Sequence, residues 1–222
     1  MQIKFLGRRD QASVEAAMRS FTHARTESTG DELWLVEHDP VYTLGVAGRA
    51  QHVLDARTVP VVRSARGGQV TYHGPGQVVA YPLVDLRRLR IYVKEYVYRL
   101  EQAVLDVLGS YGLTGHRVRG APGVFVCLDE PSGHRSLPVG TAGDDRFARL
   151  GKVAALGIKV SNHCTYHGLA FNVAMDLEPF TRIDPCGYAG LVTVDLATLG
   201  VRTSWDDAAQ RLAARLSNLL SA

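Results

Sequence analysis

The residues best suited to covalent chemistry are a cysteine and a lysine that stand far apart in the sequence. Cys186 lies between Pro185, whose ring fixes φ, and Gly187, which leaves one side of the chain open to an approaching molecule. A thiol becomes a good nucleophile when a nearby cation lowers its pKa. Lys152 is the candidate cation, because it begins an apolar run between two glycines. The same pattern also fits a lysine whose charged end reaches solvent from the end of a strand.

A glycine-rich segment at residues 66–77, Arg-Gly-Gly-Gln-Val-Thr-Tyr-His-Gly-Pro-Gly-Gln, has the composition of a ligand-binding loop. Glycine allows backbone N–H groups to converge on a ligand with no Cβ in the way. The polar side chains of Arg66, Thr71, Tyr72 and His73 suit the few polar contacts that a pocket needs. A plain hairpin loop between two strands is the alternative. A P-loop fits less well, because no Gly-Lys-Ser or Gly-Lys-Thr follows the glycines.

Two further cysteines and a pair of histidines complete the reactive groups. The odd total of three cysteines argues against a disulfide framework. Cys127 lies within an apolar segment and is predicted to be a small core residue. His163, Cys164 and His167 fall close enough together to hold zinc, but no second ligand pair follows at zinc-like spacing. The alternative is a turn at residues 165–168 that places backbone N–H groups beside a bound ligand, and we expect no metal.

Hydrophobic periodicity predicts the elements that must position these groups. Apolar residues at helical spacing indicate a helix after Asp10, a helix from Tyr92 to about residues 109–112, and a last helix from Ser204 or Trp205. Runs of strand-like residues indicate strands at 33–37, 78–84, 118–128, 152–160 and 169–177. Strands outnumber helices and cluster in the middle of the chain, which favours an α+β fold over a doubly wound parallel sheet.

Composition indicates a single domain over residues 1–222. The chain is 46% hydrophobic and 21% charged, and it contains no apolar run long enough to span a membrane and no recognisable secretory signal. We therefore expect a cytoplasmic protein. A formal net charge of +3 is small for a nucleic-acid-binding protein and better suits an acidic protein partner.

Two segments are candidates for contact with such a partner. Residues 129–150 are rich in glycine, proline and charge, so we expect a long loop that is either functional or a tolerated surface insertion. A basic stretch precedes and overlaps the helix that follows Tyr92, and it is either a docking site or a solvated helix face. Its members are Arg87, Arg88, Arg90, Lys94 and Arg99.

Four motifs, in this order and spacing, closely resemble the lipoyl (octanoyl) transferases, the lipoate-protein ligase B family. They are residues 66–77, residues 152–159 (Lys-Val-Ala-Ala-Leu-Gly-Ile-Lys), residues 165–170 (Thr-Tyr-His-Gly-Leu-Ala) and residues 185–187 (Pro-Cys-Gly). Residues 37–45, Glu-His-Asp-Pro-Val-Tyr-Thr-Leu-Gly, resemble that family's first motif. The resemblance covers roughly residues 14–200, and the chain departs from it at 129–150, where the family usually has a shorter loop.

The resemblance implies transfer of an octanoyl group from octanoyl-acyl carrier protein to the ε-amine of a lysine on a lipoyl domain, the first step of protein lipoylation. Cys186 matches the family's acyl-accepting nucleophile, and Lys152 matches its catalytic partner. The implied acceptors are lipoyl domains of 2-oxoacid dehydrogenase E2 subunits and the glycine cleavage H protein, with no nucleic acid, membrane or cofactor. The implied fold is a mixed β-sheet flanked by helices, as in lipoate and biotin protein ligase catalytic domains.

The segments that match the family's acyl-binding segments combine small and apolar residues, which suit an eight-carbon chain, with backbone N–H groups that can hold an oxyanion. Their members are Arg66, Gly67, Gly68, Gln69, Val70, Thr71, Tyr72, His73, Ala155, Leu156, Gly157, Gly168, Leu169 and Ala170.

Two other functions remain open. An ATP-dependent lipoate or biotin protein ligase would share the fold, but an enzyme that works through an acyl-adenylate has no need of the thiol in residues 185–187. A non-catalytic carrier-binding module would keep the acyl cavity and lose Cys186 or Lys152, and both are present.

Overall fold

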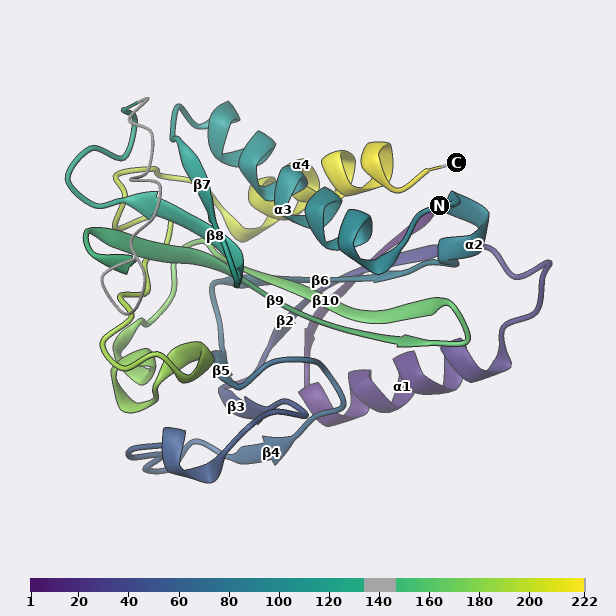
Figure 1. The fold of residues 1–222 in the computed structure, drawn as a ribbon, viewed down its shortest axis with the longest axis horizontal. Helices are drawn as coiled ribbons and strands as arrows, with labels where there is room; N and C mark the ends of the chain where they lie inside the picture. The colour runs from purple at the N-terminus through teal and green to yellow at the C-terminus, as the bar shows by residue number, and fades with distance from the viewer. Residues whose placement is uncertain (134–146, 222) are drawn as a thin grey trace.

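A seven-stranded mixed sheet forms the centre of the protein in a computed structural model that describes residues 1–133 and 147–221 (Figure 1). Its strands, in spatial order, are β1 (Gln2–Arg9), β2 (Glu32–His38), β6 (Gln77–Leu83), β10 (Cys164–Asn172), β9 (Leu150–Ser161), β8 (Ala121–Cys127) and β7 (Gly115–Val118). β1 and β2 are parallel, and the other neighbouring pairs are antiparallel. The central part of the loop expected at 129–150 lies outside the described residues.

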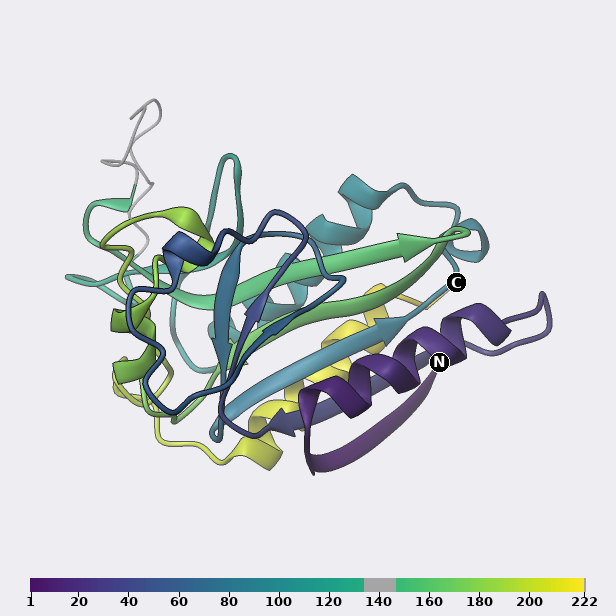
Figure 2. The same cartoon turned by 90° about the horizontal axis from the view of Figure 1, so that it is seen from below.

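A second, three-stranded sheet packs on the side of the central sheet that also carries the first helix (Figure 2). Its order is β4 (Val61–Arg63), β3 (Val41–Leu44) and β5 (Val70–His73). Short 3-10 helices border it: η1 (Ala50–His52), η3 (Glu178–Arg182) and η4 (Pro185–Gly187). Tyr42 and Tyr72 form its core together with Phe180.

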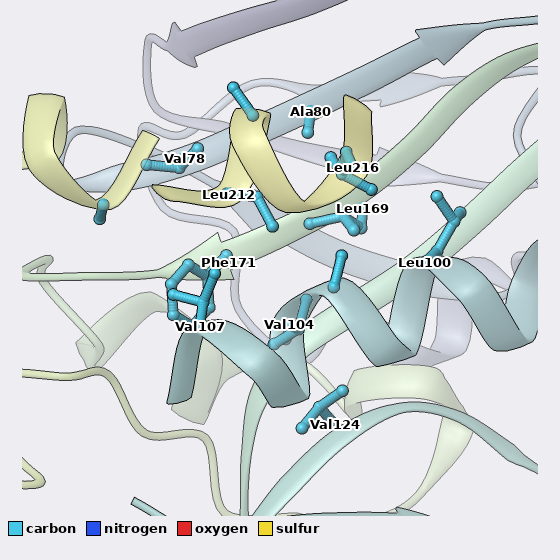
Figure 3. Packing of buried hydrophobic residues seen from close by; sticks show 14 of the residues in the cluster. Val78, Ala80, Leu100, Val104, Val107, Val124, Leu169, Phe171, Leu212 and Leu216 are labelled. Carbon is cyan, nitrogen blue, oxygen red and sulfur yellow. The ribbon is translucent and has the colours of Figure 1, made fainter. Parts of the chain in front are cut away.

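The helices cover both faces of the central sheet. α1 (Gln11–Ala24) lies on one face, whereas α3 (Val93–Ser110) and α4 (Trp205–Leu219) lie side by side on the other, and α2 (Leu86–Leu89) is a short helix before α3 (Figure 1). Alternation along the strands explains both cores. Leu169 and Phe171 of β10 pack against α3 and α4 (Figure 3), whereas Ala170 belongs to the cluster with α1.

The helix boundaries follow from capping, as the sequence predicts. The Asp10 carboxylate accepts a hydrogen bond from Ser13 N at 2.8 Å, and the Ser204 hydroxyl accepts one from Asp207 N at 3.1 Å. Each bond satisfies a backbone donor in the first turn that has no partner within the helix. The α+β prediction, with a mixed sheet flanked by helices, is confirmed.

Two predicted strands have different boundaries. The strand expected at 118–128 is β8, which begins only at Ala121 because the chain turns at Gly120 with φ +77°, and Val118 belongs to the separate strand β7. The strand expected at 169–177 is β10, which begins at Cys164 and ends at Asn172. Asn162 and His163, both at positive φ, form the tight turn before it. The turn expected at 165–168 is therefore wrong, since those residues lie within the strand.

None of the helices formed by residues 1–133 and 147–221 is both long and apolar enough to cross a membrane.

Candidate active site

A narrow cavity lies between the two sheets, with the loop at residues 66–69 as one wall. The volume of this cavity is only about 40 Å³. Its lining residues are Gln11, Arg66, Gly68, Gln69, Val70, Thr71, His73, Val79, Tyr81, Ala155, Leu156, Gly157, His167, Gly168, Leu169 and Ala170.

Arg66 holds the loop that forms this wall. Its side chain is almost fully buried. Nε donates a hydrogen bond to Thr43 Oγ1 at 2.9 Å, and Nη1 donates one to Gly67 O at 2.9 Å. The rigid, planar guanidinium thus ties the loop to β3.

Glycines allow the same loop to approach two strands closely. A Cβ on Gly45, at the end of β3, would lie 2.4 Å from Gly68 O, and a Cβ on Gly157 of β9 would lie 3.0 Å from Gly67 O. Gly67 N donates a hydrogen bond to Ile158 O at 2.9 Å. The loop therefore lies against β3 on one side and β9 on the other.

The second half of the glycine-rich segment has a structural role. Gly76 adopts φ +83°, and a Cβ there would lie 1.9 Å from Ala174 O. Gly76 N donates a hydrogen bond to the Glu37 carboxylate at 2.7 Å. The alternative of a plain hairpin loop is wrong, because the strands before and after this segment, β4 and β6, lie in different sheets. Residues 74–76 connect β5 to β6, and residues 66–69 form the cavity wall.

Lys152 lies inside the molecule. It is only 4% exposed, as the third residue of β9 opposite Phe125 of β8. Nζ donates a hydrogen bond to Pro122 O at 3.1 Å and lies 5.3 Å from the centroid of the Phe125 ring. The alternative in which its charged end reaches solvent is wrong.

Backbone contacts at both ends hold the segment that carries Cys186 beside Lys152. Before it, Asp184 N donates a hydrogen bond to His52 O at 2.9 Å, and after it, Lys152 N donates one to Val192 O at 2.8 Å. Pro185 and Lys152 line one small cavity. The Cys186 side chain lies outside the described part of the structure, so contact between its thiol and Lys152 stays a prediction.

A wider cavity adjoins the narrow one and includes Lys152. The two share Gly68, Gln69, Leu156 and Gly157. The remaining lining residues come from the loop, α3, the β7–β8 turn, β8, β9 and the chain after Cys186: Gly67, Val97, Gly120, Ala121, Pro122, Lys152, Ile158 and Tyr188. The two cavities together connect the Lys152 region with the space between the two sheets.

Buried titratable side chains also line the narrow cavity. Burial, with smaller contributions from the nearby His38 and Arg66, lowers the pKa of His73 to about 3. His167 is 2% exposed, and its Nε2 lies 3.7 Å from Glu15 Oε1, too far for a hydrogen bond. Burial acts to raise the pKa of Glu15, but His167 and hydrogen bonds such as that from Ala65 N outweigh it and lower this pKa to about 2.

A hydrogen-bond network that the sequence does not mark connects this cavity to the strand segment beside Lys152. Gln77 Nε2 donates to Asn172 Oδ1 at 2.9 Å, and Asn172 Nδ2 donates to Val194 O at 2.9 Å. The oxygen of the Gln77 amide is therefore the atom facing His73 Nδ1, at 2.7 Å. His73 thus carries its proton on Nδ1. Val194 N in turn donates to Lys152 O at 3.0 Å.

The other cysteines do not present reactive thiols. Cys127 packs with Phe125 and Phe147, which confirms the prediction of a core residue. Cys164 is also buried, and burial raises the pKa of its thiol. His163 is exposed at the turn while His167 lines the narrow cavity. Within the described ranges, no group of three His, Cys, Asp or Glu side chains could hold a metal ion.

The predicted acyl-binding residues converge, with two differences. All of them except Gly67 and Tyr72 line the narrow cavity. Gly67 lines the wider cavity, and the Tyr72 ring packs 5.4 Å from that of Tyr42 and 5.5 Å from that of Phe180. Sequence reasoning left Gln11, Val79, Tyr81 and His167 out of this set. Alternation along β6 could have indicated Val79 and Tyr81, but nothing in the sequence marks Gln11.

Comparison with known proteins decides the family. Residues 11–217 match the family model described as the lipoyl protein ligase A/B catalytic domain. The chain belongs to this family. Within it, an octanoyltransferase of Methylibium petroleiphilum is 62% identical over 221 residues, an alignment that covers 100% of this chain and 99% of that protein. An octanoyltransferase of Variovorax paradoxus is 57% identical over 221 residues, covering 100% and 98%.

These likenesses confirm the resemblance to octanoyltransferases that the motifs indicate. Among solved structures, the chain is similar to a bi-partite lipoate protein ligase from Thermoplasma acidophilum, with a TM-score of 0.73 and 15% identity over 99% of this chain and 83% of that one. At this identity the likeness shows the fold alone, and the fold is that of lipoate protein ligases.

Proposed function

We propose that this family member transfers an octanoyl group from octanoyl-acyl carrier protein to a lysine of a lipoyl domain, through a thioester on Cys186. The observation that carries the proposal is the narrow cavity, which most of the expected acyl-binding residues line and which adjoins a wider cavity containing Lys152. The small and apolar side chains that line this cavity suit an acyl chain, and the Lys152 region is where its carbonyl end would lie.

The proposed reaction has two acyl transfers that balance without ATP. In the first, the Cys186 thiolate attacks the carrier thioester, a new S–C bond replaces the old one, and Lys152 gives its proton to the departing carrier thiolate. In the second, the acceptor amine attacks the Cys186 thioester. Neutral Lys152 takes the amine proton, and an amide and the original thiolate–ammonium pair result.

The surroundings of Lys152 support this double role. A buried ammonium beside a thiol favours the thiolate, because charges interact strongly where water is excluded. Its Nζ hydrogen bond to Pro122 O fixes the group in place. His73 is a weak candidate for the base, since burial lowers its pKa to about 3. The acceptors would be lipoyl domains of 2-oxoacid dehydrogenase E2 subunits and the glycine cleavage H protein, in the cytoplasm.

The experiment that tests the function is transfer in the absence of ATP. Purified protein, octanoyl-acyl carrier protein and an apo lipoyl domain are mixed, and the mass of the lipoyl domain is measured. We expect it to increase by one octanoyl group on its lysine. Modification only with free octanoate and ATP would identify a ligase and contradict the proposal, and no modification in either mixture would contradict both.

A further inference from the structure

The wider cavity continues away from Lys152 along the edge of β9. β8 pairs with β9 only as far as Gly123 opposite Ala155, so the later part of β9 extends past it. Val97 of α3 and Ile158 of β9 line the wider cavity. Val93, one turn earlier on α3, and Val160, two residues later on β9, line the next cavity. Residues one helical turn apart, and alternate strand residues, share a face. The two cavities share no lining residue, but they lie in line between α3 and β9, and we call this line the α3–β9 groove.

The far end of this groove is an exposed apolar and basic surface, which we call the platform. Its residues are Leu86, Arg87, Arg90, Ile91, Tyr92, Val93, Val160 and His163. Tyr92 is 88% exposed and Val93 is 43% exposed. An exposed aromatic and aliphatic patch edged by charge is typical of an interaction site.

Only part of the basic stretch is available at the platform. Arg88 is bound to Asp31, and Arg99 to Glu95 and to Leu219 O at the end of α4. Arg87 bonds to the Asp85 carboxylate although its side chain is 58% exposed.

Arg90 belongs to the platform, and Lys94 directly follows the platform residue Val93. Both are exposed, and within the described residues neither side chain has a hydrogen bond or ion pair. The acidic groups nearby, Asp85 and Glu95, are each engaged with an arginine. The platform is therefore basic on balance.

We propose that the acidic acyl carrier protein docks on the platform, with Arg90 and Lys94 as its charge contacts, and that its phosphopantetheine arm follows the α3–β9 groove to Lys152. This inference rests on the proposed function, and it adds the surface on which the carrier docks and the path that its prosthetic arm follows. Distance selects the carrier over the lipoyl domain. Val160 lies eight positions after Lys152 in β9, a distance of at most about 26 Å at ~3.3 Å per residue. The side chain of an acceptor lysine is far too short for that distance, whereas an extended phosphopantetheine arm covers most of it.

The charge test compares two double variants with the same change in net charge. The platform variant, Arg90→Glu with Lys94→Glu, reverses the charges of these two exposed side chains. The α4 variant, Arg202→Glu with Arg215→Glu, reverses the charges of two exposed arginines outside the platform, one of them on α4. Arg87 is left intact because it bonds to the capping residue of α2. Each variant is acylated with octanoyl-acyl carrier protein and with S-octanoyl-N-acetylcysteamine, which has no protein and only a short arm.

We expect the platform variant to raise KM for the carrier substrate roughly tenfold, with a weaker salt dependence, and to leave the short thioester unchanged. The α4 variant should behave as the wild type with both donors. Equal effects of the platform variant on both donors, no effect on either, or an equal loss in the α4 variant would overturn the docking site.

The groove is tested with Val93→Trp, which fills it without a change in charge. Octanoyl-pantetheine, which has the arm but no carrier, should then react roughly tenfold more slowly, as should the carrier substrate, while the short thioester keeps its rate. Unchanged rates with both long donors would overturn the path. Failure of the wild-type protein to become acylated by any donor would instead contradict the proposed function.

Discussion

Lys152 is a buried lysine, and charged side chains are rarely buried in proteins. Its burial strengthens its electrostatic effect on neighbouring groups. Burying an ammonium costs free energy unless hydrogen bonds and a counter-charge offset it. The Pro122 carbonyl supplies one bond. In the proposed pairing, a thiolate on Cys186 would supply the opposite charge. Backbone hydrogen bonds join the segment that holds Cys186 to Lys152 on one side and to His52 on the other.

Removing the charge of Lys152 should make Cys186 less reactive. Lys152→Met keeps the length and apolar stem of the side chain, so we expect the pKa of the Cys186 thiol to rise by about 1–2 units and alkylation at pH 7 to slow roughly tenfold or more. Alkylation of Cys186 as a function of pH, followed by mass spectrometry, measures this. Lys159→Met, an exposed lysine on the same strand, is the matched control and should behave as the wild type. An unchanged pH profile for Lys152→Met would contradict the pairing.

Residue types indicated part of the candidate site. The loop at 66–69 was recognisable by its glycines and Lys152 by its isolation in an apolar run, and both line cavities, whereas the role of Cys186 stays a prediction. Tyr72 was placed with the acyl-binding residues because it lies among them in sequence, yet it packs in the core of the small sheet. Asn172 was not recognisable, because its bond to Val194 O joins strands that only the fold brings together.

At the scale of elements, the close contact between the end of β3 and the loop at 66–69 requires glycine at position 45. Gly45→Ala should lower the free energy of unfolding by about 1–3 kcal/mol and slow octanoyl transfer, because its Cβ would meet backbone oxygen and displace the cavity wall. Urea unfolding and the transfer rate measure the two effects. The control is Gly30→Ala, where a Cβ would meet nothing within 4 Å, so stability should change by less than about 0.5 kcal/mol. Equal behaviour of the two variants would refute this role for Gly45.

Strand existence was easier to predict than strand ends. The apolar runs in β6 and β9 indicate buried strands. The turn at Asn162 and His163 contains no glycine or proline, so the start of β10 was predicted too late in the sequence. The small sheet was not predicted as a unit. Its strands are only three or four residues long, too short for a periodic pattern, and they are held by contacts with η3 and η4 that are distant in sequence.

For the whole molecule, buried histidines predict a loss of stability in mild acid. The pKa of His73 is lowered to about 3 in the folded protein, whereas it is about 6.5 in the unfolded chain, so the unfolded state binds the proton first as pH falls. The stabilisation is complete above pH 6.5 and is lost progressively toward pH 3. Between pH 7 and pH 5 the free energy of unfolding should decrease by about 2 kcal/mol from His73 alone.

Chemical unfolding at pH 7 and pH 5 tests this. His73→Asn keeps a donor near the Gln77 amide but cannot titrate, so its stability should fall by less over the same range. The buried His38, whose pKa burial also lowers, accounts for part of the decrease that remains. His23→Asn changes an exposed histidine and should retain the full decrease. An identical decrease in wild type and His73→Asn would show that His73 does not contribute.

The covalent intermediate on Cys186 is the central claim, and intact mass spectrometry tests it most directly. After incubation with octanoyl-acyl carrier protein and no acceptor, we expect the protein to gain one octanoyl group, which hydroxylamine releases as expected of a thioester. Cys127→Ala and Cys164→Ala should retain the adduct, because both thiols are buried, and Cys186→Ser should lose the hydroxylamine-labile adduct. A labile octanoyl group that persists in Cys186→Ser, or one that maps to Cys164 in the wild type, would contradict the account.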